Sequence, residues 1–433
     1  MTRVLTANKA NELVGVPSFF PAVLEALQLQ GAKTRGLAEL TDAQWRDLLA
    51  FCDLAHLTLP LVRTCADAAP GWVRRQSDQN LADNRLRVQR IEAAYAEIAR
   101  AFDDAGIKHV VIKGFAQYPD FVESLDHRMQ SDIDLYCPEE LIPAAQFALG
   151  RLGYIGDRTL DKFPADHLPE MTRKRGWQWR GNAYDPDMPP GVDLHFCFWN
   201  AATTRLPIHG VNEFWGRRIE QRRGNFRFPA LSSMDNLAFS ALHILRDLQR
   251  GDWVIHHVYE LAWFLHTHAE DDALWQSWKR CHDDSFRSLQ AISFWLAREW
   301  FHCCLAAAVD LQISTIRRPV REWLERFSRS PLTGMFHPNK HGVWLHLALL
   351  ESRWDRLLVL GDALMPFRLP AVGAPGQDAT KGRHKRRWWP SQRYLKYVLH
   401  VAFRIGFHLQ TLPNTLWHGF CWWLDQQRFS KSF

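Results

Sequence analysis

The segment QSDIDLY, residues 130–136, constrains the fold more than any other part of the sequence. Two apolar residues alternate there with Asp132 and Asp134, which is the period of a half-buried β-strand. Residues two apart in a strand share a face, so both carboxylates point to the same side, roughly 7 Å apart along the chain. Two like charges held this close are costly unless a positive group lies between them. The segment therefore predicts a strand that has a cationic partner.

The residues around this strand have the pattern of a small mixed domain. IKHVVIKG (107–114) is a short β-branched strand that ends in glycine, and PEELIPAAQFALGRLG (138–153) is a predicted helix. WQWRGNAYD (177–185) and GVDLHFCFW (191–199) are predicted to be a third and a fourth strand. The fourth strand carries another acid, Asp193. Carboxylates from neighbouring strands can bind a hard divalent cation, so we expect Mg²⁺ here, with Mn²⁺ as an alternative.

Helical periodicity dominates the rest of the chain. Residues 41–62 have Thr41 as a predicted N-cap, and a helix over 84–106 is expected to end at Gly106. Two amphipathic helices are expected in 233–268. The predicted organisation is a helical N-terminal region (1–105), a central core (106–230), a helical region (231–365), a Pro/Gly-rich linker (366–380) and a basic, aromatic helical tail (381–433).

The central core resembles a known family. HVVIKGFAQYPDFVESLDHRMQSDIDLYC, followed by VDLHFCFW, looks like the nucleotidyltransferase superfamily that includes DNA polymerase β. More narrowly, it is similar to a poorly characterised bacterial nucleotidyltransferase family often encoded near exopolysaccharide and peptide natural-product genes. The resemblance covers roughly residues 40–265. It implies an α+β fold in which a polymerase β-like core, a small mixed sheet with helices, is embedded in helical N- and C-terminal regions.

The resemblance also implies roles for individual residues. Asp132, Asp134 and Asp193 would hold the catalytic metal, and Asp193 would also help to deprotonate the incoming hydroxyl. The residues that it places near the triphosphate are Lys113, Gly114, Arg128 and Ser131. The wider superfamily has Gly-Ser at the phosphate turn, whereas this chain has Lys113-Gly114 followed by phenylalanine. Lysine can serve as a phosphate partner in this place.

Several polar residues near the core have more than one explanation. Arg128 could pair with one of the aspartates instead of a phosphate. His195 shares the face of Asp193 in a strand, and we expect a hydrogen-bonded or packed histidine rather than an Mg²⁺ ligand. Glu260 stands where members of the family tend to have aspartate. The histidines at positions 243, 256, 257, 266 and 268 lie close together in the sequence after the core. Their spacing and the lack of a Cys partner argue against a zinc site.

The charge of the chain is distributed unevenly. The whole chain carries +6, but residues 381–433 contain ten Lys or Arg residues and one acid, Asp425, and therefore carry +9. The remainder is mildly acidic, at −3. A basic tail rich in tryptophan fits three alternatives: a helix that packs on the body, an anionic membrane surface, or, with less support, a nucleic acid.

The sequence contains no run of about 18 apolar residues and no apolar leader, and its eight cysteines form no regular framework. We expect a cytoplasmic protein with reduced cysteines, or one attached peripherally to the inner face of the membrane. The expected activity is transfer of a nucleotidyl group from an NTP to a hydroxyl or phosphate, with release of pyrophosphate. The acceptor could be a protein side chain, a small molecule or a glycan intermediate.

Two alternatives to this activity remain open at the level of the sequence. The chain could keep the fold without catalysis and act in binding or regulation. It could also be a membrane-associated accessory protein of polysaccharide or natural-product assembly, with the tail as its attachment. Metal-dependent NTP turnover separates the first alternative from an enzyme, and binding to anionic liposomes tests the second.

Overall fold

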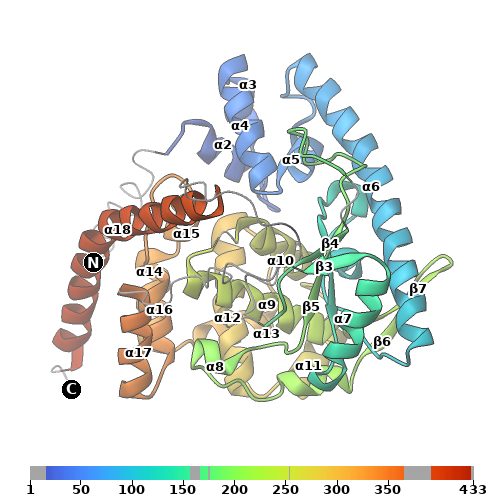
Figure 1. Ribbon diagram of the computed structural model, residues 1–433. Helices are drawn as coiled ribbons and strands as arrows, with labels where there is room; N and C mark the ends of the chain where they lie inside the picture. Colours follow the sequence, from blue (N-terminus) through green and yellow to red (C-terminus); the bar gives the residue numbers. More distant parts are fainter. Residues whose placement is uncertain (1–15, 157–165, 174–175, 253, 365–391, 431–433) are drawn as a thin grey trace, which may run out of the picture.

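The structure, a computed structural model, describes residues 16–156, 166–173, 176–252, 254–364 and 392–430. Within these residues the protein has the expected α+β fold. One seven-stranded mixed sheet lies among helices that come from both ends of the chain (Figure 1). The predicted linker, 366–380, lies outside the described residues.

The sheet has the strand order β3-β4-β5-β2-β1-β7-β6. The pairs β2–β5 and β1–β7 are parallel, and the other neighbouring strands are antiparallel. The central parallel pair contains all three of the predicted aspartates. The strands are β1 (Val110–Val111), β2 (Asp132–Tyr136), β3 (Tyr154–Gly156), β4 (Met171–Arg173), β5 (Gly191–His195), β6 (Ile219–Arg223) and β7 (Phe226–Ala230).

The prediction of a third strand over 177–185 is wrong. Gly181 has a φ of +80°, and the side chain of Asn182 accepts a hydrogen bond of 2.9 Å from the backbone of Tyr184. This local turn breaks the alternating aromatic pattern that suggested a strand. The fourth predicted strand is confirmed as β5, which ends at His195. The strands β3 and β4 and the β6–β7 hairpin were not predicted.

The helices before the sheet follow the sequence signals closely. Thr41 forms the predicted N-cap of α4, in a capping box with Gln44. Helix α6 includes the predicted 84–106 helix but begins earlier, directly after Pro70, and Gly106 follows its end with a φ of +68°. These helices are α2 (Phe19–Ala26), α3 (Arg35–Ala38), α4 (Asp42–Leu54), α5 (Thr58–Cys65) and α6 (Gly71–Asp104).

Short helices connect the strands, and longer ones follow the sheet. The connecting elements are η1 (Gly114–Gln117), η2 (Leu125–His127), η3 (Glu139–Leu141), α7 (Ile142–Arg151), α8 (Ala201–Thr204) and η5 (Val211–Trp215). The C-terminal helices are α9 (Ser233–Arg250), α10 (Ile255–Thr267), α11 (Asp272–Cys281), α12 (Asp284–Phe301), α13 (Ala307–Ser314), α14 (Arg318–Phe327), α15 (Ser330–Thr333), α16 (Gly342–Leu349), α17 (Arg353–Leu364) and α18 (Gln392–Ser430). None of the described helices is both long and apolar enough to cross a bilayer.

The two faces of the sheet have different surroundings. Ile133 and Leu135 of β2 pack with α6 and α7 in one apolar cluster. Helices α9, α10 and α12 form a second cluster together with α2, α4 and α5. Phe20 and Phe51 pack there against Phe336, with ring centroids 5.2 and 5.5 Å from that ring. Because side chains alternate along a strand, the aspartates of β2 point away from α6 and toward the side where α9 and α10 lie (Figure 1).

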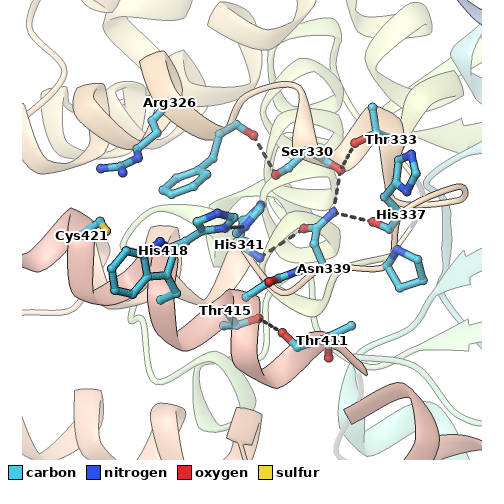
Figure 2. A pocket seen from close by; sticks show the side chains of 14 residues that line it. Arg326, Ser330, Thr333, His337, Asn339, His341, Thr411, Thr415, His418 and Cys421 are labelled. Carbon is cyan, nitrogen blue, oxygen red and sulfur yellow. Dashed lines mark hydrogen bonds between the residues drawn. The ribbon is translucent and has the colours of Figure 1, made fainter. Parts of the chain in front are cut away.

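Helix α18 lies at the edge of the molecule, beside α14, α16 and α17 (Figure 1). Gly419 allows a close approach to α16, because a Cβ atom at this position would lie 2.0 Å from Cζ2 of Trp344. Figure 2 shows a cavity of about 480 Å³ between α18 and the segment around α15, with polar lining residues that include Asn339, His341 and Thr415. None of the residues that line this cavity is one of the predicted site residues.

Candidate functional site

Two parallel strands bring the predicted carboxylates together. In the β2–β5 pair, Asp134 lies directly opposite Asp193. Aligned residues of neighbouring parallel strands point to the same face, so the two side chains are neighbours. Asp132 shares that face and lies opposite Gly191, which has no side chain to separate it from β5. The strand register therefore collects three acids on one small area of the sheet.

Asp134 is the most deeply buried of the three acids, with 2% of its surface exposed. Its Oδ1 accepts a hydrogen bond of 2.8 Å from Nζ of Lys113 and lies 3.1 Å from Nε2 of His195. Burial by itself would raise the pKa of Asp134, but the ammonium of Lys113 and the hydrogen bond from His195 hold the pKa well below its usual range. Asp134 is therefore a permanent carboxylate, and Lys113 is the cationic partner that the alternating pattern required.

Asp193 and Asp132 have the opposite electrostatic behaviour. Burial, together with the charge of Asp134, raises the pKa of Asp193 to about 8 and that of Asp132 to about 6. Oδ1 of Asp193 is buried and has no hydrogen-bond partner in the described part of the chain. Ligand atoms of Asp134, Asp193 and His195 all lie within 4.8 Å of one another, whereas Asp132 is not part of this close group. The site thus combines excess negative charge with an unsatisfied carboxylate oxygen.

A fourth acid, Glu170, belongs to the same area. A Cβ atom on Gly191 would lie 1.8 Å from Oε1 of Glu170, so the carboxylate fills the space that this glycine leaves open. Glu170 contributes to the raised pKa values of Asp132 and Asp193, and burial raises its own pKa. Sequence reasoning missed this residue, because a single glutamate just before a short strand gives no local signal.

His195 connects the acids of the sheet to helix α9. Its Nε2 faces Asp134, and its Nδ1 lies 3.9 Å from Oδ2 of Asp166. Burial lowers the pKa of His195 to about 4, so the ring is neutral and its Nε2–H donates a hydrogen bond to the carboxylate of Asp134. Asp166 is buried and forms an ion pair with Arg246 of α9. The expectation of a hydrogen-bonded histidine is confirmed, whereas Asp166 and Arg246 were not predicted.

The turn after β1 carries the residues expected near a triphosphate. Gly114 has a φ of +67°, and a Cβ atom there would lie 2.1 Å from Nε2 of Gln130. Glycine is therefore required both by the backbone conformation and by the space available. The carbonyl of Ser131 accepts a hydrogen bond of 3.2 Å from the backbone of Gly191, which joins β2 to β5. Gly114, Lys113 and Ser131 thus surround the acids at one end of β2.

Arg128 pairs with neither of the aspartates of β2. Its Nε lies 2.8 Å from Oε1 of Glu260 on α10, and both side chains are about nine-tenths buried. Burial raises the pKa of Glu260, and the charge of Arg128 opposes this shift. Glu260 of α10 therefore has an ion-pair partner that lies 132 positions earlier in the sequence. This ion pair fastens α10 to the loop that leads into β2.

Helix α6 supports the same loop from the other side. The side-chain amide of Asn84 donates hydrogen bonds to the carbonyls of Leu125, Asp126 and Arg128, at 3.3, 2.8 and 3.0 Å. Arg87 is buried, and its Nε donates to the carbonyl of Gln130 at 2.7 Å. Sequence reasoning missed both residues. They occupy the helical positions that continue the buried stripe of Ile91, Tyr95, Ile98 and Phe102.

Polar residues in an apolar stripe are the signal that could have identified Asn84 and Arg87. Such residues are buried by the helix that carries them, so they must find hydrogen-bond partners in the fold. Burial lowers the pKa of Arg87 to about 10, and the charge of Asp132 opposes this shift. The two residues hold the backbone that positions the carboxylates, and we treat them as positioning residues.

Comparison with known proteins adds one positive finding. A family model described as an uncharacterised nucleotidyltransferase matches residues 41–302, which is more than half of the chain. This range includes the sheet, the acids and helices α9 and α10. No curated protein and no solved structure matches the chain.

Proposed function

The chain belongs to the uncharacterised nucleotidyltransferase family, and from this premise we propose that it transfers a nucleotidyl group from an NTP to a hydroxyl or phosphate acceptor. Pyrophosphate is the second product. The observation that carries the proposal is the pair Asp134 and Asp193, opposite each other on parallel strands, with a buried carboxylate oxygen that has no partner among the described residues. The proposal includes a polymerase β-like arrangement of the core around this pair.

Mg²⁺, or Mn²⁺ in its place, fits the donor set of this site. Asp134 and Asp193 would hold the ion, with Asp132 as a third carboxylate, because hard divalent cations prefer oxygen ligands. Burial and the charge of Asp134 raise the pKa values of Asp132 and Asp193, and Oδ1 of Asp193 has no hydrogen-bond partner among the described residues, so a cation bound here would relieve the repulsion between the acids. When bound, the ion would neutralise the carboxylates and the phosphates of the nucleotide.

The protein supplies the remaining steps with its own side chains. Asp193 accepts the proton of the acceptor hydroxyl as the acceptor oxygen bonds to the α-phosphorus and the bond to pyrophosphate breaks. Lys113 would contribute positive charge for the triphosphate, and Gly114 would allow the backbone to approach it closely. Arg128 would do the same only by exchanging its ion pair with Glu260 for a phosphate. His195 keeps Asp134 in one orientation through the hydrogen bond to Oδ1. A phosphate acceptor needs no such proton transfer at neutral pH.

An assay with labelled NTPs tests this proposal. The purified protein is incubated with each α-labelled NTP, Mg²⁺ and a cell extract that supplies acceptors, and both pyrophosphate release and transfer of label are measured. We expect turnover with at least one NTP and its loss when EDTA removes the metal. Binding of NTP without any pyrophosphate release would instead support a binding or regulatory protein that has kept only the fold.

We also propose that α18 attaches the protein to an anionic membrane surface. Thr411, Thr415 and Gly419 face the body of the protein, and Gly419 packs closely against Trp344. The opposite side of the helix carries large apolar side chains that are at least half exposed: Ile405, Leu409, Trp417, Phe420 and Trp423. The surrounding sequence, 381–433, carries +9. Exposed aromatic residues on a basic helix fit the interface of an anionic bilayer.

A further inference from the structure

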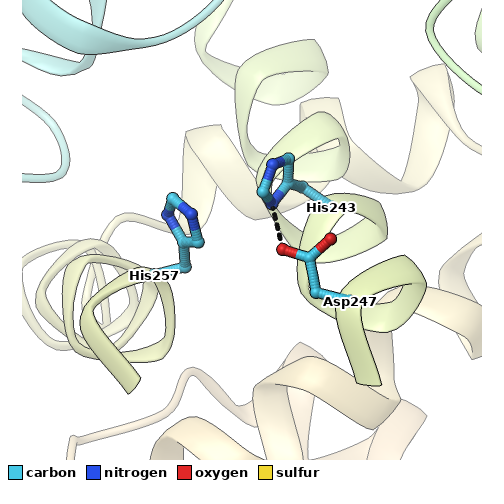
Figure 3. A group of neighbouring side chains, drawn as sticks. All are labelled: His243, Asp247 and His257. Carbon is cyan, nitrogen blue, oxygen red and sulfur yellow. Dashed lines mark ion pairs between the residues drawn. The ribbon is translucent and has the colours of Figure 1, made fainter. Parts of the chain in front are cut away.

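Helices α9 and α10 bring together three side chains that the nucleotidyltransferase chemistry does not use. His243 and Asp247 lie one turn apart on α9, and His257 approaches them from α10 (Figure 3). Ligand atoms of these three residues all lie within 4.8 Å of one another. The group contains two imidazoles and one carboxylate, and it is separate from the acids of the sheet.

The nitrogen of His243 that faces Asp247 has no hydrogen-bond partner among the described residues. Nδ1 of His243 lies 3.0 Å from Oδ2 of Asp247, yet it makes no hydrogen bond in the described part of the chain. The other carboxylate oxygen, Oδ1, accepts a hydrogen bond of 3.1 Å from Nε of Arg246. Arg246 therefore orients Asp247 and leaves Oδ2 free to face the histidines. Such a partner behind a ligand is common at metal sites in proteins.

The second histidine stands opposite the first. The ring centroids of His243 and His257 are 4.5 Å apart, and the two planes meet at 69°. About nine-tenths of the side-chain surface of His243 and of Asp247 is buried.

We propose that His243, Asp247 and His257 bind a zinc ion. Two imidazole nitrogens and one carboxylate oxygen are a typical donor set for Zn²⁺, and three protein ligands leave a fourth position for water. Bonds of about 2.0–2.1 Å in a tetrahedral site place ligand atoms about 3.3 Å apart. The separation of 3.0 Å between His243 and Asp247 is close to this value, and the ligand atom of His257 lies within 4.8 Å of both.

The neighbouring charges are compatible with a cation at this place. Arg246 is the positive group closest in sequence, and its charge is shared between Asp247 and Asp166. Lys113 is paired with Asp134. The proposed ion is distinct from Mg²⁺ of the proposed function, because imidazole nitrogen suits zinc and carboxylate oxygen suits magnesium. Sequence spacing argued against this site because it considered only histidines and cysteines, and the third ligand is an aspartate.

Measurement of bound metal tests the assignment. The full-length protein, freed of metal with chelator, is dialysed against Zn²⁺, and bound zinc per chain is determined by mass spectrometry. Replacement by Co²⁺ then reports tetrahedral ligation through its visible spectrum. The ligand variants are His243→Gln, Asp247→Asn and His257→Gln. The matched control is His256→Gln, which changes the adjacent imidazole of α10, whose ring centroid is 3.8 Å from that of His257.

We expect one tightly bound zinc in the wild type, in His256→Gln and in Asp193→Asn, and at least a tenfold loss of affinity in each ligand variant. A cooperative melting transition shows that each variant has folded, and zinc should raise the melting temperature of the wild type and of the control but not of the ligand variants. Equal zinc affinity in the ligand variants and the wild type would overturn the proposal. So would loss of zinc in Asp193→Asn, because the metal would then belong to the acids of the sheet.

Discussion

At the scale of single residues, Asp193 and Asp134 should respond differently to the same substitution. Asp193→Asn removes a buried carboxyl group whose Oδ1 has no hydrogen-bond partner among the described residues and whose ionised form is repelled by Asp134. We expect NTP turnover to fall at least a hundredfold, while the free energy of unfolding in EDTA stays equal or rises by about 1 kcal/mol. Asp134→Asn should lose turnover to the same extent but also destabilise the fold, since the buried ammonium of Lys113 loses its partner.

Pyrophosphate release and urea unfolding measure these two effects separately. Asp187→Asn is a suitable control, because this carboxylate is exposed and pairs with the exposed side chain of Arg90. It should leave both quantities nearly unchanged. Full turnover in Asp193→Asn would contradict the proposed chemistry, whatever the stability of the variant.

His109 should make stability depend on pH. The ring is buried beside Tyr95, whose hydroxyl lies 2.9 Å from Nε2, and burial lowers the pKa of His109 to about 4. The unfolded chain, with a pKa near 6.5, therefore binds a proton before the folded protein does, and stability falls as pH drops from about 6.5 to 4. The contribution of His109 is at most about 3 kcal/mol. Urea unfolding of His109→Gln across this pH range should show a smaller slope than the wild type, and an unchanged slope would contradict the assignment.

At the scale of secondary-structure elements, α6 should matter for the loop that leads into β2. Asn84→Ala removes three hydrogen bonds to backbone carbonyls of that loop. The carbonyl of Leu125 still accepts from the backbone of Arg128, so the cost falls mainly on the carbonyls of Asp126 and Arg128. We expect a loss of about 2–3 kcal/mol in the free energy of unfolding. Arg85→Ala is the matched control on the same helix, because its ion pair with Asp126 is largely exposed and should contribute less than about 1 kcal/mol. Equal effects of the two substitutions in urea unfolding would show that the loop does not depend on Asn84.

The same elements show what a sequence can and cannot predict. The strand β2, the acids Asp132 and Asp134 and the cap of α4 were predictable, because alternation and capping are local patterns. The hairpin β6–β7 was missed because β6 has four polar residues in a row after Ile219 and is largely exposed, so it lacks the apolar alternation of a half-buried strand. The prediction of a strand over 177–185 was wrong because a local turn forms around Asn182. Local patterns therefore identified the acids but not all of the sheet that aligns them.

At the scale of the whole molecule, the site depends on contacts between distant parts of the chain. Arg128 forms an ion pair with Glu260, and Asp166 forms one with Arg246. Each pair joins a loop of the core to a helix that follows the core. The sequence pattern does not predict such pairs, because polar residues are common in helices and loops and do not indicate which residue they contact. The helices after the sheet thus complete the environment of the acids, and they also carry the proposed zinc ligands.

The whole-molecule prediction concerns the outer side of α18. Replacing Trp417, Phe420 and Trp423 by serine removes exposed apolar surface without touching the side that packs on Trp344, so the fold should remain intact. Flotation with phosphatidylglycerol vesicles should show at least a tenfold loss of binding relative to the wild type. Trp354→Ser, which changes an exposed tryptophan on α17, serves as the control and should bind normally.

The dependence of binding on salt distinguishes the electrostatic part of this attraction from the hydrophobic part. Each Lys or Arg near an anionic bilayer contributes about 1 kcal/mol, and the attraction is screened within about 8–10 Å near physiological ionic strength. Since ten such residues lie in 381–433, wild-type binding should fall steeply as salt rises and should be absent with neutral vesicles. Binding that ignores salt would mean that the aromatic residues insert without help from the charge. Equal binding by the triple variant would remove the outer side of α18 from the contact altogether.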